Sequence, residues 1–258
     1  MSARFHAATF AKGWLSVALA SSADKDLTVL NRTVAIEDYP TGVRLVSTDR
    51  YVLLTAWVPN LDTSNDAEPL VDEAPDRTVI ARDTDSRGKG LLGYLLTLHN
   101  RQDSLEREHD PIELTLTYDV EMPDGNQQGT LEGMAPRYVV FDVPDTERVY
   151  LDTIGDTYPD WRHLLDGFTP VSTDTIHLSP ERLDRLARLR KYADGPIAWT
   201  FAGPDKAAKV DMVASDPHVT GIVMPVRWLE EPDQTEPETE PADDTPELRD
   251  GETVLTVV

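Results

Sequence analysis

The sequence predicts an α+β fold built from three successive βαβββ units, with the helices on one face of antiparallel sheets. One extended segment, one amphipathic helix and three further extended segments follow each other in the same order three times. Polar connectors separate the copies, at Asn60–Asp76 and Asp156–Pro170. A chain of 258 residues with 40% hydrophobic content is long enough for one large domain or two small ones.

The first unit predicts a strand at Arg4–Thr9 and a helix at Phe10–Ala20. Apolar residues in the helical segment recur at the spacing of one helix face. Three extended runs follow, separated by turn residues such as those at 38–42: Leu27–Glu37, Gly42–Ser47 and Tyr51–Val58.

The second unit repeats this order. A strand is expected at Thr78–Arg82 and a helix at Gly88–Gln102, where five leucines recur at helical spacing. Three strands then follow, with a long loop over 123–136 between the first two: Ile112–Met122, Tyr138–Val143 and Arg148–Ile154.

The third unit begins with an expected strand at Thr175–Leu178. Ser179 is a favourable N-cap and Pro180 suits the first helical position, so we expect a helix at Pro180–Tyr192. The strands that complete the unit are Ile197–Ala202, Lys209–Ala214 and Val219–Trp228.

The net charge of −23 is unevenly distributed along the chain. Between Glu230 and Glu252, eleven acidic residues stand against the single base Arg249, in a segment rich in Pro, Thr and Glu. Such a segment cannot form a core, so we expect residues 230–258 to be an acidic disordered tail. The total charge disfavours nucleic acid as a partner, but the charge of each element has to be considered separately.

The three predicted helices are rich in bases, although acidic residues outnumber bases in the whole chain. The first two contain no acidic residue, and the third carries five bases against two acids. The apolar arc of the third consists of Leu183, Leu186, Ala187 and Leu189. A basic helix surface in an acidic protein suits a polyanion, and solvated helix faces are the alternative. The candidate polyanion-facing residues are Lys12, Arg87, Lys89, Arg101, Arg185, Arg188 and Lys191.

The sequence contains no candidate residues for several classes of chemistry. The absence of cysteine excludes disulfides, zinc ribbons and thiol catalysis, and the six histidines lack the spacing of metal ligands. No serine lies in a G-x-S-x-G turn. No window reaches the length of a membrane span, and the N-terminus lacks the features of a signal peptide. We therefore expect a cytoplasmic protein that is not an enzyme, uses no cofactor or metal, and does not contact a membrane.

The segment Gly221–Trp228 predicts a strand at a sheet edge or terminus, because Pro225 cannot donate to a ladder. Its alternating apolar residues, beside unpaired backbone, suit the binding of a short extended peptide. An ordinary core strand is the alternative.

Three stretches together resemble the bacterial and phage DNA polymerase III β sliding clamp family. Ser47–Leu53 is similar to the family's ATDGHRLA stretch, although Arg50-Tyr51-Val52 departs from it. Asp156–Arg162 resembles the connector G-x-F-P-D-Y-R, and Gly221–Trp228 is similar to the C-terminal Y-V-V-M-P-M-R-L. The resemblance covers the chain from Arg4 to Trp228 and thins in the loops.

The resemblance implies a DNA-clamp fold, and a pocket between the middle and last clamp domains that binds linear motifs of DNA polymerase and the clamp loader. The pocket residues that it implies are Thr48, Tyr51, Leu53, Pro159, Leu164, Val223, Met224, Pro225 and Val226. It further implies non-specific contacts of helix bases with duplex DNA inside a homo-oligomeric ring, with no bond chemistry.

The chain departs from the family in the number of units. A bacterial clamp chain has six βαβββ units, whereas this sequence predicts three, so a ring would need four chains, or three if a unit is overlooked. We expect a shortened clamp with a clamp-like domain at 1–155, a connector at 156–174, a half domain at 175–229 and the tail at 230–258. A clamp-like peptide-binding adaptor or decoy that closes no ring is the alternative function.

Overall fold

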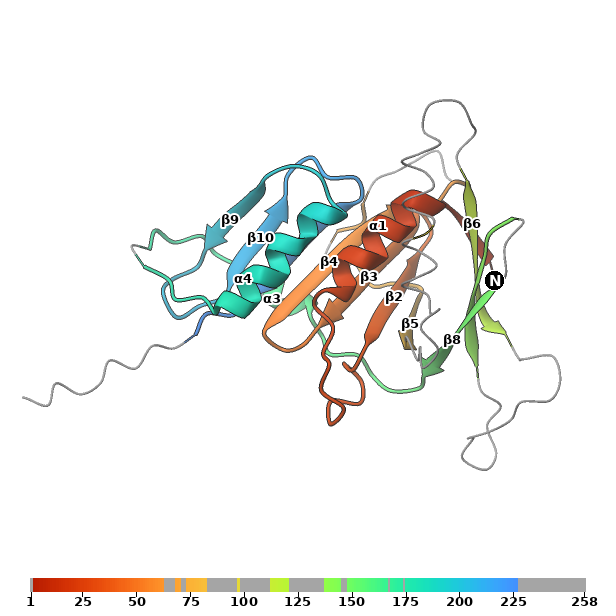
Figure 1. Ribbon diagram of the computed structural model, residues 1–258, viewed down its shortest axis with the longest axis horizontal. Helices are drawn as coiled ribbons and strands as arrows, with labels where there is room; N and C mark the ends of the chain where they lie inside the picture. The colour runs from red at the N-terminus through yellow and green to blue at the C-terminus, as the bar shows by residue number, and fades with distance from the viewer. Residues whose placement is uncertain are drawn as a thin grey trace, which may run out of the picture. The chain divides into compact units, whose positions relative to one another are not determined.

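The computed structural model of the chain describes residues 2–62, 68–70, 73–82, 97, 112–120, 137–144, 148–166, 168–173 and 175–226 (Figure 1). Contacts between residues group Met1–Arg227 as one unit. The loop at 123–136, the tail at 230–258 and all of the expected helix at Gly88–Gln102 except Thr97 lie outside the described residues. The proposed division of the chain after residues 155 and 174 stays a prediction.

Eleven strands form one antiparallel sheet in the order β1-β6-β7-β8-β5-β2-β3-β4-β11-β10-β9. The strands are β1 Ser2–His6, β2 Thr33–Tyr39, β3 Gly42–Thr48, β4 Val52–Pro59, β5 Arg77–Arg82, β6 Glu113–Val120, β7 Tyr138–Asp142, β8 Val149–Ile154, β9 Ile197–Phe201, β10 Ala208–Met212 and β11 His218–Val223. The helices are α1 Ala7–Ala18, α3 Arg162–Asp166, α4 Pro180–Ala187 and the 3₁₀ helix η1 Arg188–Lys191. The predicted α+β class with antiparallel strands is confirmed.

The strand order shows how the three units join. The first two units exchange their leading strands: β1 pairs with β6 of the second unit, and β5 lies between β2 and β8. The third unit attaches through β11, which pairs with β4 over six residue pairs. One continuous sheet therefore carries elements of all three units.

Both longer helices cover the same face of this sheet. Val52 and Leu54 on β4 pack in the core beneath α1, and their cross-strand partners are Val223 and Gly221 on β11. Because directly paired residues share a sheet face, the α1 side is also the side on which Leu186 of α4 is buried. Figure 1 shows α1 and α4 on the same side of the strands. A smaller core covers the opposite face: Leu30, Ala35, Val46, Leu53, Ile80, Tyr158 and Trp161.

Helix α1 begins three residues earlier than the sequence predicts. The expected strand at Arg4–Thr9 ends at His6, and the alanines at 7 and 8, which favour helix, open α1. The N–H of Ala7 donates to the carbonyl of Ile112 at 2.8 Å. Residues on most of the helix circumference are buried, and only Thr9, Lys12 and Ala18 are partly exposed. In the described residues no helix is long and apolar enough to span a membrane.

Three further strand predictions are wrong. The strand expected at Val219–Trp228 ends at Val223 and lies between β4 and β10, not at the predicted sheet edge. The strand expected at Leu27–Glu37 begins only at Thr33, because residues 22–32 form turns, with Arg32 at a φ of 53°. The strand expected at Thr175–Leu178 is absent, although those residues are described. Helix α3 lies inside the segment interpreted as a connector.

The third predicted helix is shorter and less buried than expected. The α-helical part ends at Ala187 and continues as one 3₁₀ turn, η1. Leu186 and Leu189 are buried as predicted, whereas Leu183, expected in the same buried arc, is 41% exposed.

Gly221 is required where the third unit meets β4. A Cβ there would lie 2.2 Å from the carbonyl oxygen of Leu53 and 2.7 Å from Leu54 Cδ2. We expect Gly221→Ala to lower the free energy of unfolding by about 1–3 kcal/mol, because backbone atoms must shift to make room. Denaturant unfolding measures the change, with Gly155→Ala as the control, since nothing lies within 4 Å of a Cβ at that position. Equal stabilities of the two variants would contradict this close approach.

Candidate functional site

A cavity of about 460 Å³ opens on the sheet face opposite α1 and α4. Four separate stretches meet there: the loop before β2, the β3–β4 turn, the segment leading into α3, and the end of β11. Leu53 on β4 and Ile222 on β11 are directly paired, so their side chains share this face. The cavity is lined by Asp26, Leu27, Thr28, Val29, Leu30, Thr48, Arg50, Tyr51, Leu53, Thr157, Pro159, Asp160, Trp161, Leu164, Ile222 and Met224.

Six residues that the sequence assigned to a pocket line this cavity: Thr48, Tyr51, Leu53, Pro159, Leu164 and Met224. The other three do not line it. Val223 points to the opposite face and is buried in the core beneath the helices, because successive strand residues alternate. Pro225 and Val226 lie beyond the strand, and the N–H of Val226 donates to the carbonyl of His177 at 2.8 Å.

The loop at 26–30 is the largest part of the lining that the sequence did not indicate. Its apolar residues and β-branched Val29 favour a strand when only the sequence is considered. The contact of this loop with the cavity arises only in the folded chain. The guanidinium of Arg82 on β5 donates to the carbonyl of Thr28 and ties this loop to the sheet. Ile222, by contrast, could have been predicted to line the cavity, since it lies two residues before Met224 on the same face.

The side chain of Asp49 holds the β3–β4 turn. Its Oδ1 accepts hydrogen bonds from the N–H groups of Tyr51 at 2.9 Å and Val52 at 2.7 Å, as in an Asx turn. Arg50 has a φ of 79°, and its N–H donates to Thr48 Oγ1 at 3.1 Å. The turn therefore presents the Tyr51 ring, which is 55% exposed, at the cavity.

Two arginines of α4 contact this turn and the end of β11. Arg185 forms an ion pair with the second carboxylate oxygen of Asp49. The guanidinium of Arg182 lies 4.5 Å from the centroid of the Tyr51 ring and donates to the carbonyls of Met224 and Pro225. The N–H of Met224 donates to the carbonyl of Tyr51 at 2.8 Å. These contacts fix the two apolar side chains at one end of the cavity relative to each other.

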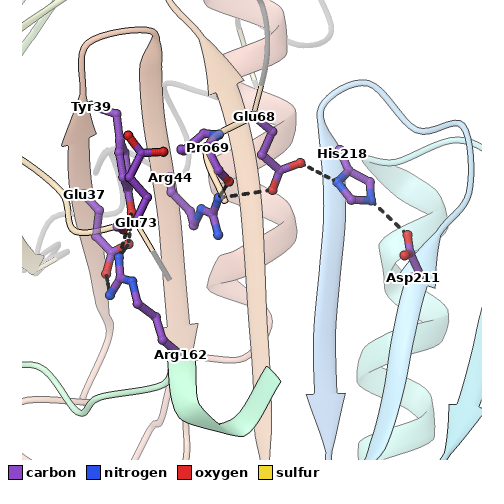
Figure 2. A network of polar contacts seen from close by, with 9 residues as sticks. All are labelled: Glu37, Tyr39, Arg44, Glu68, Pro69, Glu73, Arg162, Asp211 and His218. Carbon is purple, nitrogen blue, oxygen red and sulfur yellow. Dashed lines mark hydrogen bonds and ion pairs between the residues drawn. The ribbon is translucent and has the colours of Figure 1, made fainter. Parts of the chain in front are cut away.

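The segment leading into α3 is anchored by Glu37 of β2, a carboxylate with only 2% exposure. Trp161 Nε1–H donates to Glu37 at 2.9 Å, and Arg162 donates to both Glu37 oxygens, at 3.0 and 2.5 Å. Arg162 also donates to the hydroxyl of Tyr39 at 2.7 Å. Burial and the nearby Glu37 carboxylate raise the pKa of the Tyr39 phenol, so the hydroxyl stays neutral. Figure 2 shows Arg162 reaching toward Glu37.

A second buried cation, Arg44 on β3, continues this polar row across the sheet. It is 1% exposed, is the cross-strand partner of Glu37, and lies 5.6 Å from the Trp161 ring centroid. Its guanidinium donates to the carbonyl of Pro69 at 2.7 Å and lies 3.4 Å from Glu68 (Figure 2). The buried charge of Arg44 is thus met by a carbonyl, a carboxylate and aromatic faces.

His218 on β11 ends the row. It lies 2.8 Å from Glu68 and 3.0 Å from Asp211 of β10, so one ring connects the 68–70 segment to two strands of the third unit (Figure 2). The hydrogen bond to Glu68, followed by that to Asp211, raises the pKa of His218 to about 9. The ring is therefore charged at neutral pH and donates from both nitrogens.

We expect His218 to make stability depend on pH. Because its pKa in the folded chain, about 9, lies above the reference value of 6.5, its contribution is complete below about pH 6.5 and is lost as pH rises through 9. The side chain is 42% exposed, so the loss should be about 1 kcal/mol or less. Unfolding in denaturant between about pH 6 and pH 10 measures it. The difference between wild type and His218→Gln should shrink over this range, and a constant difference would contradict the assignment.

The predicted DNA-facing residues lie in different environments. On the helix face of the sheet, Lys12 is partly exposed, Lys191 is exposed, and Arg188 is exposed but pairs with Asp184 at 2.5 Å. Arg185 contacts Asp49, and 35% of its side chain remains exposed. The other three predicted residues lie outside the described residues: Arg87, Lys89 and Arg101.

A single antiparallel sheet with helices on one face and a cavity on the other has the architecture of DNA clamps. No protein-family model and no curated protein matches the sequence. Solved structures do match: the chain has the fold of bacterial DNA polymerase III β sliding clamps.

Three of these structures illustrate the similarity. The DnaN sliding clamp of Pseudomonas aeruginosa, crystallised with griselimycin, has a TM-score of 0.54 and 12% identity over 88% of this chain. The β subunit of Thermotoga maritima has a TM-score of 0.53 and 13% identity over 89% of it. For the β subunit assigned in Eubacterium rectale the values are 0.52, 10% and 88%. The matched part spans 66% of each of these chains. At such identities the likeness defines the fold alone.

Proposed function

We propose that this chain is a sliding clamp, a processivity factor that encircles duplex DNA and binds linear motifs of a DNA polymerase and a clamp loader. The observation that carries the proposal is the apolar cavity, which lies opposite the helix face and has four separate stretches as its walls. This role is non-enzymatic: the chain would provide a binding surface for partners and form part of a ring around DNA.

The chemistry of the cavity suits a short peptide with an apolar anchor. Its interior is formed by aliphatic and aromatic side chains such as Leu53, Trp161 and Ile222. Large apolar side chains at its rim remain accessible, with Tyr51 55%, Leu164 43% and Met224 37% exposed. An aromatic or leucine side chain inserted there would bury these groups, and a binding site of this size gives contacts that exchange readily.

The helix face would meet the DNA. Lys12 lies on α1, and Arg188 and Lys191 lie on η1. Lysine and arginine contacts to phosphates attract DNA without recognising its sequence. Because such contacts do not depend on base identity, a closed ring of several copies could slide along the duplex.

The second candidate is a clamp-like adaptor or decoy that binds peptides without closing a ring. The pairing of Arg185 with Asp49 and of Arg188 with Asp184 favours it, since both cations are already neutralised within the chain. The two functions share the cavity and differ in assembly.

Two measurements separate these functions. Fluorescence anisotropy of a labelled synthetic peptide with adjacent leucine and phenylalanine anchors tests the cavity, and the clamp and the adaptor both require binding. Light scattering over the micromolar range tests assembly, and a stable trimer or tetramer supports the clamp. A monomer at every concentration, together with peptide binding, would favour the adaptor, and a failure to bind any such peptide would contradict both.

The DNA face is tested by Arg188→Glu combined with Lys191→Glu. We expect the doubly substituted chain to bind DNA more weakly, with the slope of log affinity against log salt reduced by about 2 per chain if each residue meets one phosphate. Retention on nicked circular DNA, titrated with salt, measures this change. The control is Arg188→Lys with Lys191→Arg, which keeps both charges. Unaltered retention in the glutamate variant would remove these residues from the DNA face.

A further inference from the structure

We infer that Glu37 is the positioning residue of the cavity: a buried carboxylate that holds the wall from Thr157 to Leu164 in its binding geometry. The inference rests on the proposed peptide-binding function and assigns a role to a residue that does not line the cavity. Glu37 would act on a bound peptide only through Trp161 and Arg162.

The wall needs such an anchor because no strand holds it. Between the end of β8 and the start of α3 the chain runs without regular structure, and α3 has only five residues. Among the described residues, 157–166 make two backbone hydrogen bonds besides those within the helix, one at each end of α3. Leu164 N–H donates to the carbonyl of Trp161 at 3.1 Å, and Phe168 N–H donates to the carbonyl of Leu165 at 3.2 Å. Side chains must therefore fix this wall against the sheet.

Glu37 meets that requirement from the centre of the sheet. Its two oxygens accept four hydrogen bonds: one from the Trp161 indole, two from the Arg162 guanidinium and a longer one, 3.4 Å, from the Tyr39 hydroxyl. Trp161 and Arg162 are consecutive in the chain. Because two adjacent side chains hydrogen-bond to one carboxylate, they fix both the position and the direction of the backbone that joins them. Trp161 lines the cavity and is 2% exposed, so its orientation decides the shape of the interior.

The charges around Glu37 make its carboxylate hard to replace. The guanidinium of Arg162 lies 4.7 Å from the Trp161 ring centroid and that of Arg44 lies 5.6 Å from it, so two cations flank one indole. Among the described residues, Arg44 forms an ion pair with Glu68, whereas Arg162 forms one with Glu37. Without the Glu37 charge, the partly buried Arg162 would favour solvent, and its movement would carry Trp161 with it.

Without the Glu37 charge, fewer molecules would have the wall in its binding geometry. The contacts available to a peptide in those molecules would be unchanged. A peptide binds only the fraction of molecules whose wall is in place, and the apparent dissociation constant rises as the inverse of that fraction. If the wall is in place in about a tenth of the molecules, affinity falls about tenfold through a slower association rate, while the dissociation rate stays unchanged.

The test is Glu37→Gln, which keeps the size of the side chain and an acceptor for the Trp161 indole but removes the charge that Arg162 needs. We expect about tenfold weaker binding of the leucine-phenylalanine peptide by stopped-flow fluorescence, confined to the association rate. Amide hydrogen exchange of residues 158–166 in the free chain should accelerate, while that of β3 does not. Both measurements are made well below the unfolding temperature of each variant.

The matched control is Glu68→Gln, which removes an acidic partner of Arg44 and His218 in the same polar row but touches neither Trp161 nor Arg162. It should leave association and exchange of 158–166 at wild-type values. Equal association rates and equal exchange in Glu37→Gln and wild type would overturn the inference while leaving peptide binding intact. If wild type binds no peptide, the proposed function fails, and the exchange measurement alone still decides whether Glu37 holds the wall.

Discussion

Trp161→Ala should lower the free energy of unfolding by about 3–5 kcal/mol, the largest effect that we expect from a single substitution. The side chain is among the largest fully buried in the described chain, and it belongs to the smaller core, where few other residues can fill the space it leaves. Its loss also removes one of the four hydrogen bonds to the buried carboxylate of Glu37. Denaturant unfolding followed by circular dichroism measures the change.

Trp199→Ala is the matched control for this substitution. Trp199 lies on the edge strand β9, is only partly buried, and stacks on Phe201 with the ring centroids 6.3 Å apart, a separation typical of aromatic pairs. We expect a loss of about 1–2 kcal/mol there, because less apolar surface leaves the interior. If the two alanine variants were equally stable, Trp161 would not be the centre of the smaller core.

The double substitution Tyr51→Ala with Met224→Ala should weaken peptide binding about 100-fold or more, equivalent to about 2.7 kcal/mol. Both side chains line the cavity, and each remains accessible to a ligand. Since their exposed fractions are 55% and 37%, truncation should change the unfolding free energy much less than it changes binding. Anisotropy titration with the labelled peptide gives the affinity, and thermal unfolding gives the stability.

Val226→Ala separates the cavity from its surroundings. Val226 has the same exposed fraction as Met224, 37%, and lies two residues further along the chain, but it does not line the cavity. We expect its substitution to leave affinity unchanged. Weakened binding in Val226→Ala to the level of the double variant would show that the ligand occupies another surface.

The geometry connects the two proposed partner surfaces through α4. This helix lies on the face proposed for DNA, yet Arg182 and Arg185 extend from it to the turn and strand end that border the cavity. Asp49 is the common point, because one of its oxygens organises the turn and the other pairs with Arg185. Substitutions at Arg185 are therefore expected to affect peptide binding as well as any contact with DNA.

The local pattern of apolar and turn residues was sufficient to predict most strands of the sheet. Alternating or continuous β-branched runs predicted β3, β4 and β5 to within one or two residues, because these strands are bounded by turn residues on both sides. Pattern failed at Leu27–Glu37, whose apolar loop residues pack on the cavity, and at Thr175–Leu178. A run of apolar residues indicates burial, but the partner that buries it decides between strand and loop.

The sequence by itself determined the α+β class and the order of most strands, because spacing and turn chemistry act over a few residues. The resemblance of three short stretches to the clamp family supplied six of the residues that line the cavity. Only the tertiary structure decided that Glu37 is buried against Trp161 and Arg162, 124 and 125 residues away, and that Asp49 pairs with Arg185, 136 residues away. A charged residue in a strand gives no local sign of its partner. Its burial becomes stable only when folding brings the opposite charge and the hydrogen-bond donors to it.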